Sequence, residues 1–178
     1  MRKQVDILWA TLGEAGLVLA MAAISWTVNQ PLIFASLGPT AYELVEQPHQ
    51  KSARAYNIIV GHLIGLGAAF LALYLLNAWN DPNAIAAGVI STKRLWAMTL
   101  AAALTALLTL AARAAQPASL ATTLLVALGS MQTRSDAFAI ILGVLIIAAI
   151  GEPLRRIRLK QATRLEALQK MASNFEAK

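Results

Sequence analysis

Cysteine is absent from this chain of 178 residues, and charged residues make up only 13% of it. The absence of cysteine excludes disulfide bridges and thiolate metal sites. Charged residues make up about 25% of a typical soluble domain, whereas this chain is 58% hydrophobic and has a mean hydropathy of +0.60. This composition excludes an ordinary soluble protein and is typical of an integral membrane protein.

Residues with catalytic chemistry are also scarce. There are two histidines, and no cluster of histidine and acidic residues has the spacing of metal ligands. The sequence also lacks the glycine–serine elbow of a hydrolase. An enzymatic alternative would pair Ser36 as nucleophile with His62 as base. We expect no catalytic residue, no metal and no cofactor.

Positive charge gathers at the end of the chain. The net charge is +6, and seven of the 15 Lys and Arg residues follow Glu152. A basic segment after a hydrophobic one is typical of a cytoplasmic membrane flank, and no soluble domain is visible that would carry a nucleic-acid site. In this segment apolar residues recur at helical spacing: Leu165, Leu168, Met171 and Phe175. We expect residues 155–178 to form a basic amphipathic cytoplasmic tail that lies on the membrane or on a partner.

Four segments are long and apolar enough to cross a bilayer, which takes about 20 residues. They cover residues 5–28, 58–76, 95–112 and 137–154. The first follows a short basic start but shows no small-residue cleavage site, so we expect an uncleaved helix and not a signal peptide.

Two shorter apolar segments, residues 31–48 and 117–129, resemble each other. Each follows a Gln-Pro pair, Gln30-Pro31 and Gln116-Pro117, and each contains a Ser-Leu-x-x-Thr string that starts at Ser36 or Ser119. Proline ends the preceding helix in both places. We therefore expect an all-α membrane protein with four long transmembrane helices and two broken or short helices. A transmembrane domain over 1–154 would hold two weak repeats, 5–77 and 95–154, in inverted orientation.

The short segments can be placed in two ways. Each crosses the membrane once, which makes six crossings, or each re-enters and returns, which leaves four. With six crossings, 12 of the 15 Lys and Arg residues lie on the side of the two termini. Both arrangements put the termini in the cytoplasm, because Lys and Arg accumulate on that side. We favour six crossings because the two repeats are then inverted.

Broken helices in a membrane protein indicate a path, since non-helical backbone is tolerated there only inside protein or along a wet cavity. Helix N-termini bind anions, so we expect the two short helices to point their N-termini toward each other near mid-membrane. We expect Gly38 to adopt a backbone angle that only glycine takes readily. Helix capping is the alternative role for the Ser and Thr residues. The predicted substrate-binding residues are Ser36, Gly38, Thr40, Asn57, His62, Ser119, Thr122 and Thr123.

His62 is an ionisable residue inside a predicted span, which makes it a functional candidate by default. We expect it to face the interior near Ser36, either binding the substrate or only packing against a neighbouring helix. Gly61 and Gly65 have the spacing of a close helix contact. Asn57 precedes them by one turn and could tie this span to a broken segment. Glu14 needs a partner, with His62 and Arg113 as candidates, and we assign it a structural or gating role.

These residues resemble the HPP family of small bacterial and plastid membrane proteins. The resemblance is carried by the strings at 34–41 (FASLGPTA), 48–49 (PH) and 57–65 (NIIVGHLIG), and by 117–124 (PASLATTL) later in the chain. Gln116-Pro117-Ala118 stands in place of the His-Pro-Pro signature that names the family. The resemblance implies a four-span protein, and some members are linked to nitrite transport.

We therefore predict a transporter or channel for small inorganic anions, with nitrite or nitrate as the first candidates. The alternative is a non-transporting scaffold that binds a partner or anionic lipid through its basic tail. We expect a multi-pass protein of a bacterial inner membrane, whose partners are the lipid bilayer and a small anion, with no nucleic acid. So small a chain leaves little protein around a path, so we also expect a homo-oligomer.

Overall fold

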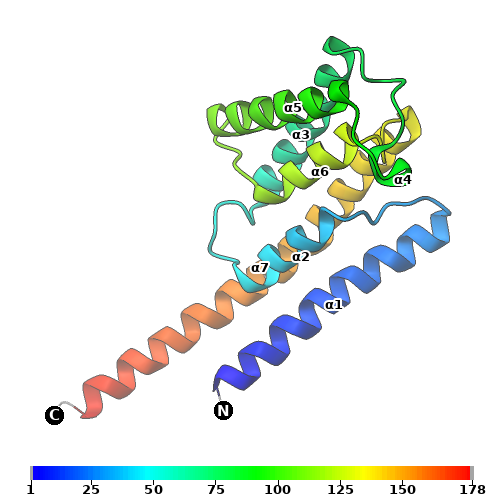
Figure 1. Ribbon diagram of the computed structural model, residues 1–178. Coiled ribbons are helices and arrows are strands. Elements are labelled where there is room, and N and C mark those ends of the chain that lie inside the picture. Colours follow the sequence, from blue (N-terminus) through cyan, green and yellow to red (C-terminus); the bar gives the residue numbers. More distant parts are fainter. Residues whose placement is uncertain (1, 177–178) are drawn as a thin grey trace.

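The computed structural model describes the backbone of residues 2–176 and the side chains of residues 7–161. Every regular element in the described part is a helix, so the predicted all-α membrane fold is confirmed (Figure 1). The helices are α1 (Arg2–Val28), α2 (Leu37–Glu46), α3 (Ala55–Leu75), α4 (Ala84–Ala87), α5 (Thr92–Ala111), α6 (Pro117–Ala127) and α7 (Arg134–Glu176).

Four helices are long and apolar enough to cross a membrane, and they match the four predicted spans. The spanning segments are Ile7–Val28, Ala55–Leu75, Thr92–Ala111 and Arg134–Gln161. The predicted short segments form α2 and α6, of 10 and 11 residues. Helices of that length extend only about 15 Å, roughly half the thickness of the hydrocarbon core. The one-turn helix α4 was not predicted; the Asn83 side chain caps it.

Both breaks begin in the same way. The residue that follows α1 is Asn29, with a φ of 51°, and Arg113 has a φ of 52° just after the end of α5. A left-handed residue turns the chain sharply away from the helix axis. Pro31 and Pro117 follow, and neither can donate a hydrogen bond to continue the helix. In the first half, the Ser25 hydroxyl accepts hydrogen bonds from two amides of the extended segment, Leu32 and Ile33.

Each short helix carries the chain back to the opposite end of the bundle. In the first half, Gly13, in the N-terminal half of α1, lies against Val45 at the end of α2. In the second half, the hydroxyl of Tyr56 at the start of α3 donates to Ala112, where α5 ends. The end of α6 lies beside the loop after α3, because Ala84 N donates to Leu128 O. Each short segment forms one helix and not a hairpin, which is the arrangement that six crossings would require; only four helices are long enough to span a membrane by themselves, so the six crossings stay a prediction. The helix directions are those of an inverted repeat, although the repeat itself stays a prediction.

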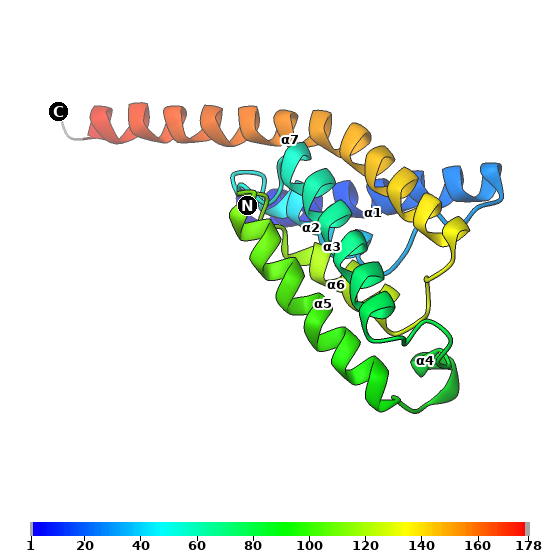
Figure 2. The same cartoon turned by 90° about the horizontal axis from the view of Figure 1, so that it is seen from above.

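The two halves exchange their last helices. Helix α3 packs on α5 and α6 of the second half, and α7 packs on α1 and α2 of the first. The two groups form inclined layers that meet where α3 contacts α7 (Figure 2). The short helices therefore lie inside the bundle, each covered by a long helix from the other half.

Glycines allow this exchange. A Cβ on Gly61 of α3 would lie 2.8 Å from Gln116 Cβ and 3.1 Å from Ala114 O, which belong to the break in the second half. A Cβ on Gly143 of α7 would collide with Leu32 O, in the break of the first half. Each last helix thus approaches the backbone of the opposite break at a glycine.

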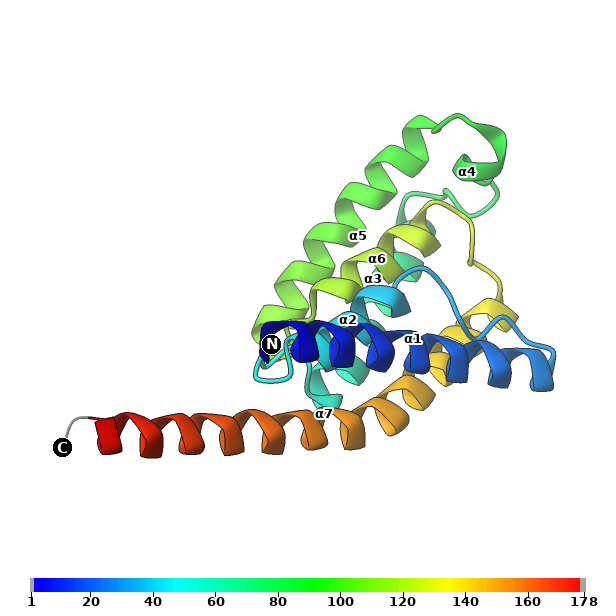
Figure 3. The same cartoon turned by 90° about the horizontal axis from the view of Figure 1, so that it is seen from below.

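Helix α7 continues without interruption past residue 154, with Pro153 inside it. Its final part runs out from the bundle, and both chain ends lie on the same side (Figures 1 and 3). The domain boundary predicted after residue 154 therefore falls within one helix. The side chains of the predicted apolar stripe, from Leu165 to Phe175, lie outside the described ones.

A fully buried arginine closes the opposite end of the bundle, and the sequence analysis did not single it out. Arg94, at the start of α5, donates to the carbonyls of Pro82, Asp81 and Ala127 and to Gln132 Oε1. These acceptors belong to the loop after α3 and to the end of α6. The last carbonyls of a helix have no partner inside that helix, and a cation placed beside them stabilises it. Arg94 bonds to such a carbonyl at the end of α6 and to free carbonyls of the loop. Arg94 therefore joins three segments that would otherwise separate.

Candidate functional site

A line of buried polar side chains runs between α2, α3 and α6, and we call it the polar seam. Its members in or next to α2 recur at helical spacing on one face. Polar groups inside an otherwise apolar bundle are costly unless they bond to one another. The seam consists of Ser36, Thr40 and Glu43 near or in α2, His62 in α3, and Gln116 and Thr122 near or in α6.

His62 is fully buried at the centre of the seam. Its Nε2 lies 3.1 Å from Thr40 Oγ1, and its Nδ1 lies 2.7 Å from Thr122 Oγ1. Both ring nitrogens are thus hydrogen-bonded to hydroxyls from two different short helices. His62 faces the interior, as we predicted, and it joins α2 to α6.

Two more bonds close a ring around His62. Ser36 Oγ and Thr122 Oγ1 lie 2.6 Å apart, and Thr40 Oγ1 donates to Ser36 O at 3.1 Å. All four residues have zero exposure. The alternative role of a helix cap is therefore excluded for the Ser36 side chain. Its hydroxyl makes no capping bond to α2 and bonds to Thr122 instead.

Ser119 and Thr123 belong to a separate set of bonds on the α5 side of α6. Ser119 Oγ donates to Gln116 O at 2.6 Å, and Thr123 bonds to Thr105 Oγ1 at 2.9 Å. Gly65 allows α3 to pack closely against α6, because a Cβ on Gly65 would lie 2.7 Å from both Ser119 O and Thr123 Oγ1. Their hydroxyls therefore support helix packing and do not reach the ring around His62.

The prediction that the short helices point their N-termini at each other is wrong. The start of α2 at Ser36 bonds to Thr122 in the middle of α6, whereas the start of α6 at Gln116 lies near Glu43, toward the end of α2. The two helices are therefore antiparallel neighbours. Inverted repeats reverse the direction of every helix, but they do not require the two starts to meet at one point.

The reason given for Gly38 is also wrong. Its φ is not positive, and a Cβ there would have no heavy atom within 4 Å. Gly38 is an ordinary half-exposed residue in the first turn of α2. It lines an apolar pocket of about 350 Å³ together with Phe34, Ala35 and Leu37, which are neighbours of Ser36 in the chain.

Asn57 ties α3 to the second break, since its Nδ2 donates to Ala115 O at 3.1 Å. Glu14 is not brought to the seam. It is half-buried on α1, and no hydrogen bond or ion pair joins it to His62 or Arg113 among the described residues. The gating role of Glu14 and the binding roles of the other residues stay predictions.

The analysis of the sequence missed the pair at the other end of the seam. Gln116 is 4% exposed, and its Oε1 accepts from Ala118 N as the cap of α6. Its Nε2 and Glu43 Oε2 are buried atoms that lack hydrogen-bond partners within the described part. Burial raises the pKa of Glu43, while the nearby Gln116 and Ser52 side chains lower it less. The spacing of Ser36, Thr40 and Glu43 on one helical face could have indicated this pair.

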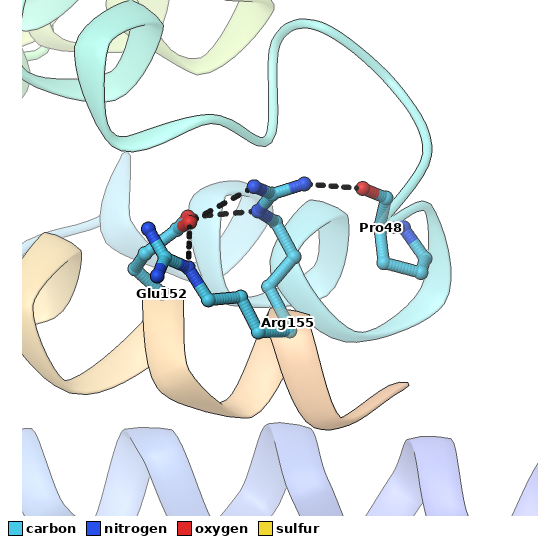
Figure 4. A network of polar contacts seen from close by, with 4 residues as sticks. Pro48, Glu152 and Arg155 are labelled. Atoms are coloured by element: carbon cyan, nitrogen blue, oxygen red, sulfur yellow. Dashed lines mark hydrogen bonds and ion pairs between the residues drawn. The ribbon is translucent and has the colours of Figure 1, made fainter. Parts of the chain in front are cut away.

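The loop after α2 is fastened to α7 by an arginine (Figure 4). Arg155 donates to Pro48 O at 2.8 Å and forms an ion pair with Glu152 at the same distance. Arg156 also pairs with Glu152, although its side chain is 71% exposed. This network holds the Pro48-His49 string against the end of the bundle, close to Glu43 in the chain.

The helices and the buried seam define the class: this is a polytopic helical membrane protein with a polar core. A family model described as "HPP, transmembrane region" matches residues 1–162. The chain belongs to this family, as the resemblance indicated. No curated protein and no solved structure shows significant similarity to the chain.

Proposed function

We propose that the protein is a transporter or channel for small inorganic anions, with nitrite and nitrate as the first candidates. One observation carries this proposal: a closed network of three hydroxyls and an imidazole joins the two short helices inside an apolar bundle. Such a network is costly at membrane depth and is typical of a substrate path. The link of some family members to nitrite agrees with it.

The hydrogens of this network can be assigned by counting donors. Thr40 donates to Ser36 O, so it must accept from His62, which places a hydrogen on Nε2. In the neutral ring Nδ1 then accepts from Thr122, which in turn accepts from Ser36. Every hydroxyl hydrogen is used inside the ring. In this state the network has no donor to offer to a ligand.

A hydrogen on Nδ1 reverses part of this order. His62 then donates to Thr122, Thr122 donates to Ser36, and the Ser36 hydroxyl hydrogen is released. Nε2, now without a hydrogen, accepts from Thr40, which gives up its bond to Ser36 O. Ser36 precedes the first turn of α2, where the helix dipole favours negative charge. Moving one hydrogen on the imidazole therefore provides a hydroxyl donor for an anion at this position.

The chemistry of the ring suits a small monovalent anion. Its donors are neutral, and no Lys or Arg side chain bonds to it among residues 7–161. Neutral donors and a helix end stabilise an ion of low charge density, whereas a multiply charged anion demands fixed cations. The apolar pocket beside Gly38 is lined by residues of α1 and α7 and by the chain neighbours of Ser36.

The remaining expectations are part of the same proposal. The protein performs no catalysis and resides in a bacterial inner membrane with both termini in the cytoplasm. That orientation agrees with the position of the chain ends on one side of the bundle (Figure 1). Helix α1 leaves Leu12, Leu19 and Trp26 exposed, a face that lipid or a second copy would cover.

Purified protein in liposomes tests the proposal. We expect a nitrite or nitrate gradient to dissipate faster than in empty liposomes, and faster than a sulfate gradient. The His62→Val variant, at equal protein level, should lose this flux. Fluxes equal to those of empty liposomes for all small monovalent anions would contradict the proposal and favour the scaffold alternative.

A further inference from the structure

The seam ends at a carboxylate that has no cation for a partner. Glu43 lies on the face of α2 that carries Ser36 and Thr40, at i, i+4 and i+7. Its Oε2 is buried and without a hydrogen bond, as is the Nε2 of Gln116. Glu43, Gln116 and Ser52 are close enough for the two polar groups to stabilise the charged carboxylate.

The amide of Gln116 is turned toward this carboxylate for a structural reason. Its Oε1 caps the first turn of α6 by accepting from Ala118 N at 3.1 Å, so its Nε2 points away from that turn. The side chain is 96% buried and packs against Gly61 of α3. A buried N–H donor next to a helix start is a position that attracts negative charge, and the Glu43 carboxylate is the group beside it.

Other charges do not neutralise Glu43. Helix α6 contains no ionisable residue, and α3 contributes His62, which bonds to Thr40 and Thr122. Glu152 pairs with Arg155 and Arg156 on α7. No ion pair to Glu43 occurs within residues 7–161. Among residues 7–161, the other ionisable groups in α1, α2, α3, α7 and the loop after α2 are Glu14, Tyr42, Glu46, His49, Lys51, Arg54, Tyr56, Tyr74, Arg134, Asp136, Arg158 and Lys160.

We propose that Glu43 is a gate that imitates the transported anion. Its carboxylate occupies the place beside the Gln116 amide and the start of α6 where a mobile anion would otherwise bind. When Glu43 is charged, it excludes the anion by occupation and by repulsion. When Glu43 takes up a proton, the place becomes available, and the seam opens at this end.

This gate gives a defined direction of pH dependence. The protonated carboxyl is the open form, so transport falls as the pH rises through the pKa of Glu43. Burial raises that pKa above the ordinary value for glutamate, which moves the transition toward neutral pH. The gate also explains why a seam with neutral donors elsewhere ends in an acidic residue.

The inference rests on the proposed anion transport, and the experiment separates the two. Nitrite flux is measured in proteoliposomes from pH 5 to pH 8 for the wild type, Glu43→Gln, Glu43→Asp and the matched control Glu46→Gln. Glu46 is exposed on the same helix, one turn further on. At pH 8 we expect Glu43→Gln to conduct several-fold faster than the wild type, because its amide carries no charge at any pH.

The other variants sharpen the result. Glu43→Asp keeps the charge on a shorter side chain, so a pH-dependent flux should remain. Glu46→Gln should follow the wild type at every pH. Near pH 5 the wild type and Glu43→Gln should converge.

Several outcomes would overturn the gate while leaving anion transport intact. These are a Glu43→Gln flux at pH 8 that does not exceed the wild type, loss of flux in that variant at equal protein level, or Glu43→Asp behaving like Glu43→Gln. If Glu43→Gln does not accumulate, a pH-independent flux in Glu43→Asp would decide against the gate. No flux in the wild type at any pH would instead reject the proposed function, and the gate with it.

Discussion

The two halves of the molecule share a framework but differ in their chemistry. Each has a long helix, a proline break, a short helix and a last helix that packs across the other half. Gly61 and Gly143 make the equivalent close approaches to the opposite break. The residue after each glycine differs: His62 in the first half and Val144 in the second, both buried.

This difference shows that a symmetric framework need not produce two sites. The first half contributes the imidazole, two hydroxyls and the carboxylate of Glu43 to the seam, and the second half contributes Thr122 and Gln116. A second imidazole at position 144 would have to be buried in the hydrophobic core, to which Val144 belongs. The exchange of last helices is what brings one half's imidazole to the other half's hydroxyls.

The largest expected effect comes from breaking the shared framework. Gly61→Ala and Gly143→Ala place a Cβ against backbone that cannot move away, so both should destabilise the protein by about 1–3 kcal/mol. Thermal unfolding in detergent measures this. Gly67→Ala is the matched control, because no atom lies within 4 Å of its Cβ, and it should be neutral or stabilising by about 0.5–1 kcal/mol. Similar unfolding temperatures for all three variants would show that α3 and α7 do not pack as described.

The second effect removes the difference between the halves. His62→Val gives α3 the residue that α7 carries at the matching position, and anion flux should fall at least tenfold because no imidazole remains to reverse the hydroxyls. Folding should be largely preserved, because the two hydroxyls that bond to His62 each keep another hydrogen bond. Thr122 remains bonded to the Ser36 hydroxyl, and Thr40 still donates to Ser36 O. Leu63→Val, at an exposed neighbouring position, is the control. Unchanged flux in His62→Val would reduce His62 to a packing role.

A third prediction compares the two matched serines. Ser36→Ala removes the hydroxyl that bonds across the seam, whereas Ser119→Ala removes one that bonds only to Gln116 O. A hydrogen bond of this kind stabilises by about 1 kcal/mol, which corresponds to roughly a fivefold change in transport rate if the bond is made to the transported ion. Flux measured at equal protein level should fall for Ser36→Ala and stay near the wild type for Ser119→Ala. Equal losses in both variants would mean that the two halves contribute alike.

The smallest effect is expected at Gly38. Because its backbone angle is ordinary and its Cβ would meet open space, Gly38→Ala should leave both stability and flux within about 0.5 kcal/mol of the wild type. Thr40→Ala should be the more severe change, since it removes a partner of His62 Nε2. The two fluxes measured side by side decide this order. A Gly38→Ala variant without flux would restore the helix-start mechanism expected from the sequence.

Local features of the chain made much of the fold predictable. The four long apolar segments predicted the four spanning helices to within a few residues at most ends. Gln30-Pro31 and Gln116-Pro117 marked both breaks, because proline acts on its own backbone wherever it stands. The burial of His62 near Ser36 was predictable for a similar reason, since a polar ring at membrane depth must find protein partners.

Contacts between distant segments were not predictable in this way. Arg94 stands just before a predicted span, where nothing in the neighbouring sequence indicates burial, yet four groups 12 to 38 residues away in the chain accept its hydrogen bonds. Only the antiparallel packing of α2 and α6 brings Glu43 to Gln116, which is 73 residues away in the chain. The mistaken angle at Gly38 came from assuming a sharp turn where the helix has already begun.

The sequence by itself determined that the chain enters a membrane, where its long helices begin and end, and which residues break them. Hydrophobicity, proline and glycine act over a few neighbouring residues, so their effects can be read without coordinates. Only the tertiary structure decided which polar residues meet. The last helices cross between the halves, and hydrogen bonds such as Ser36–Thr122 depend on two segments 86 residues apart packing in one register, which no local pattern specifies.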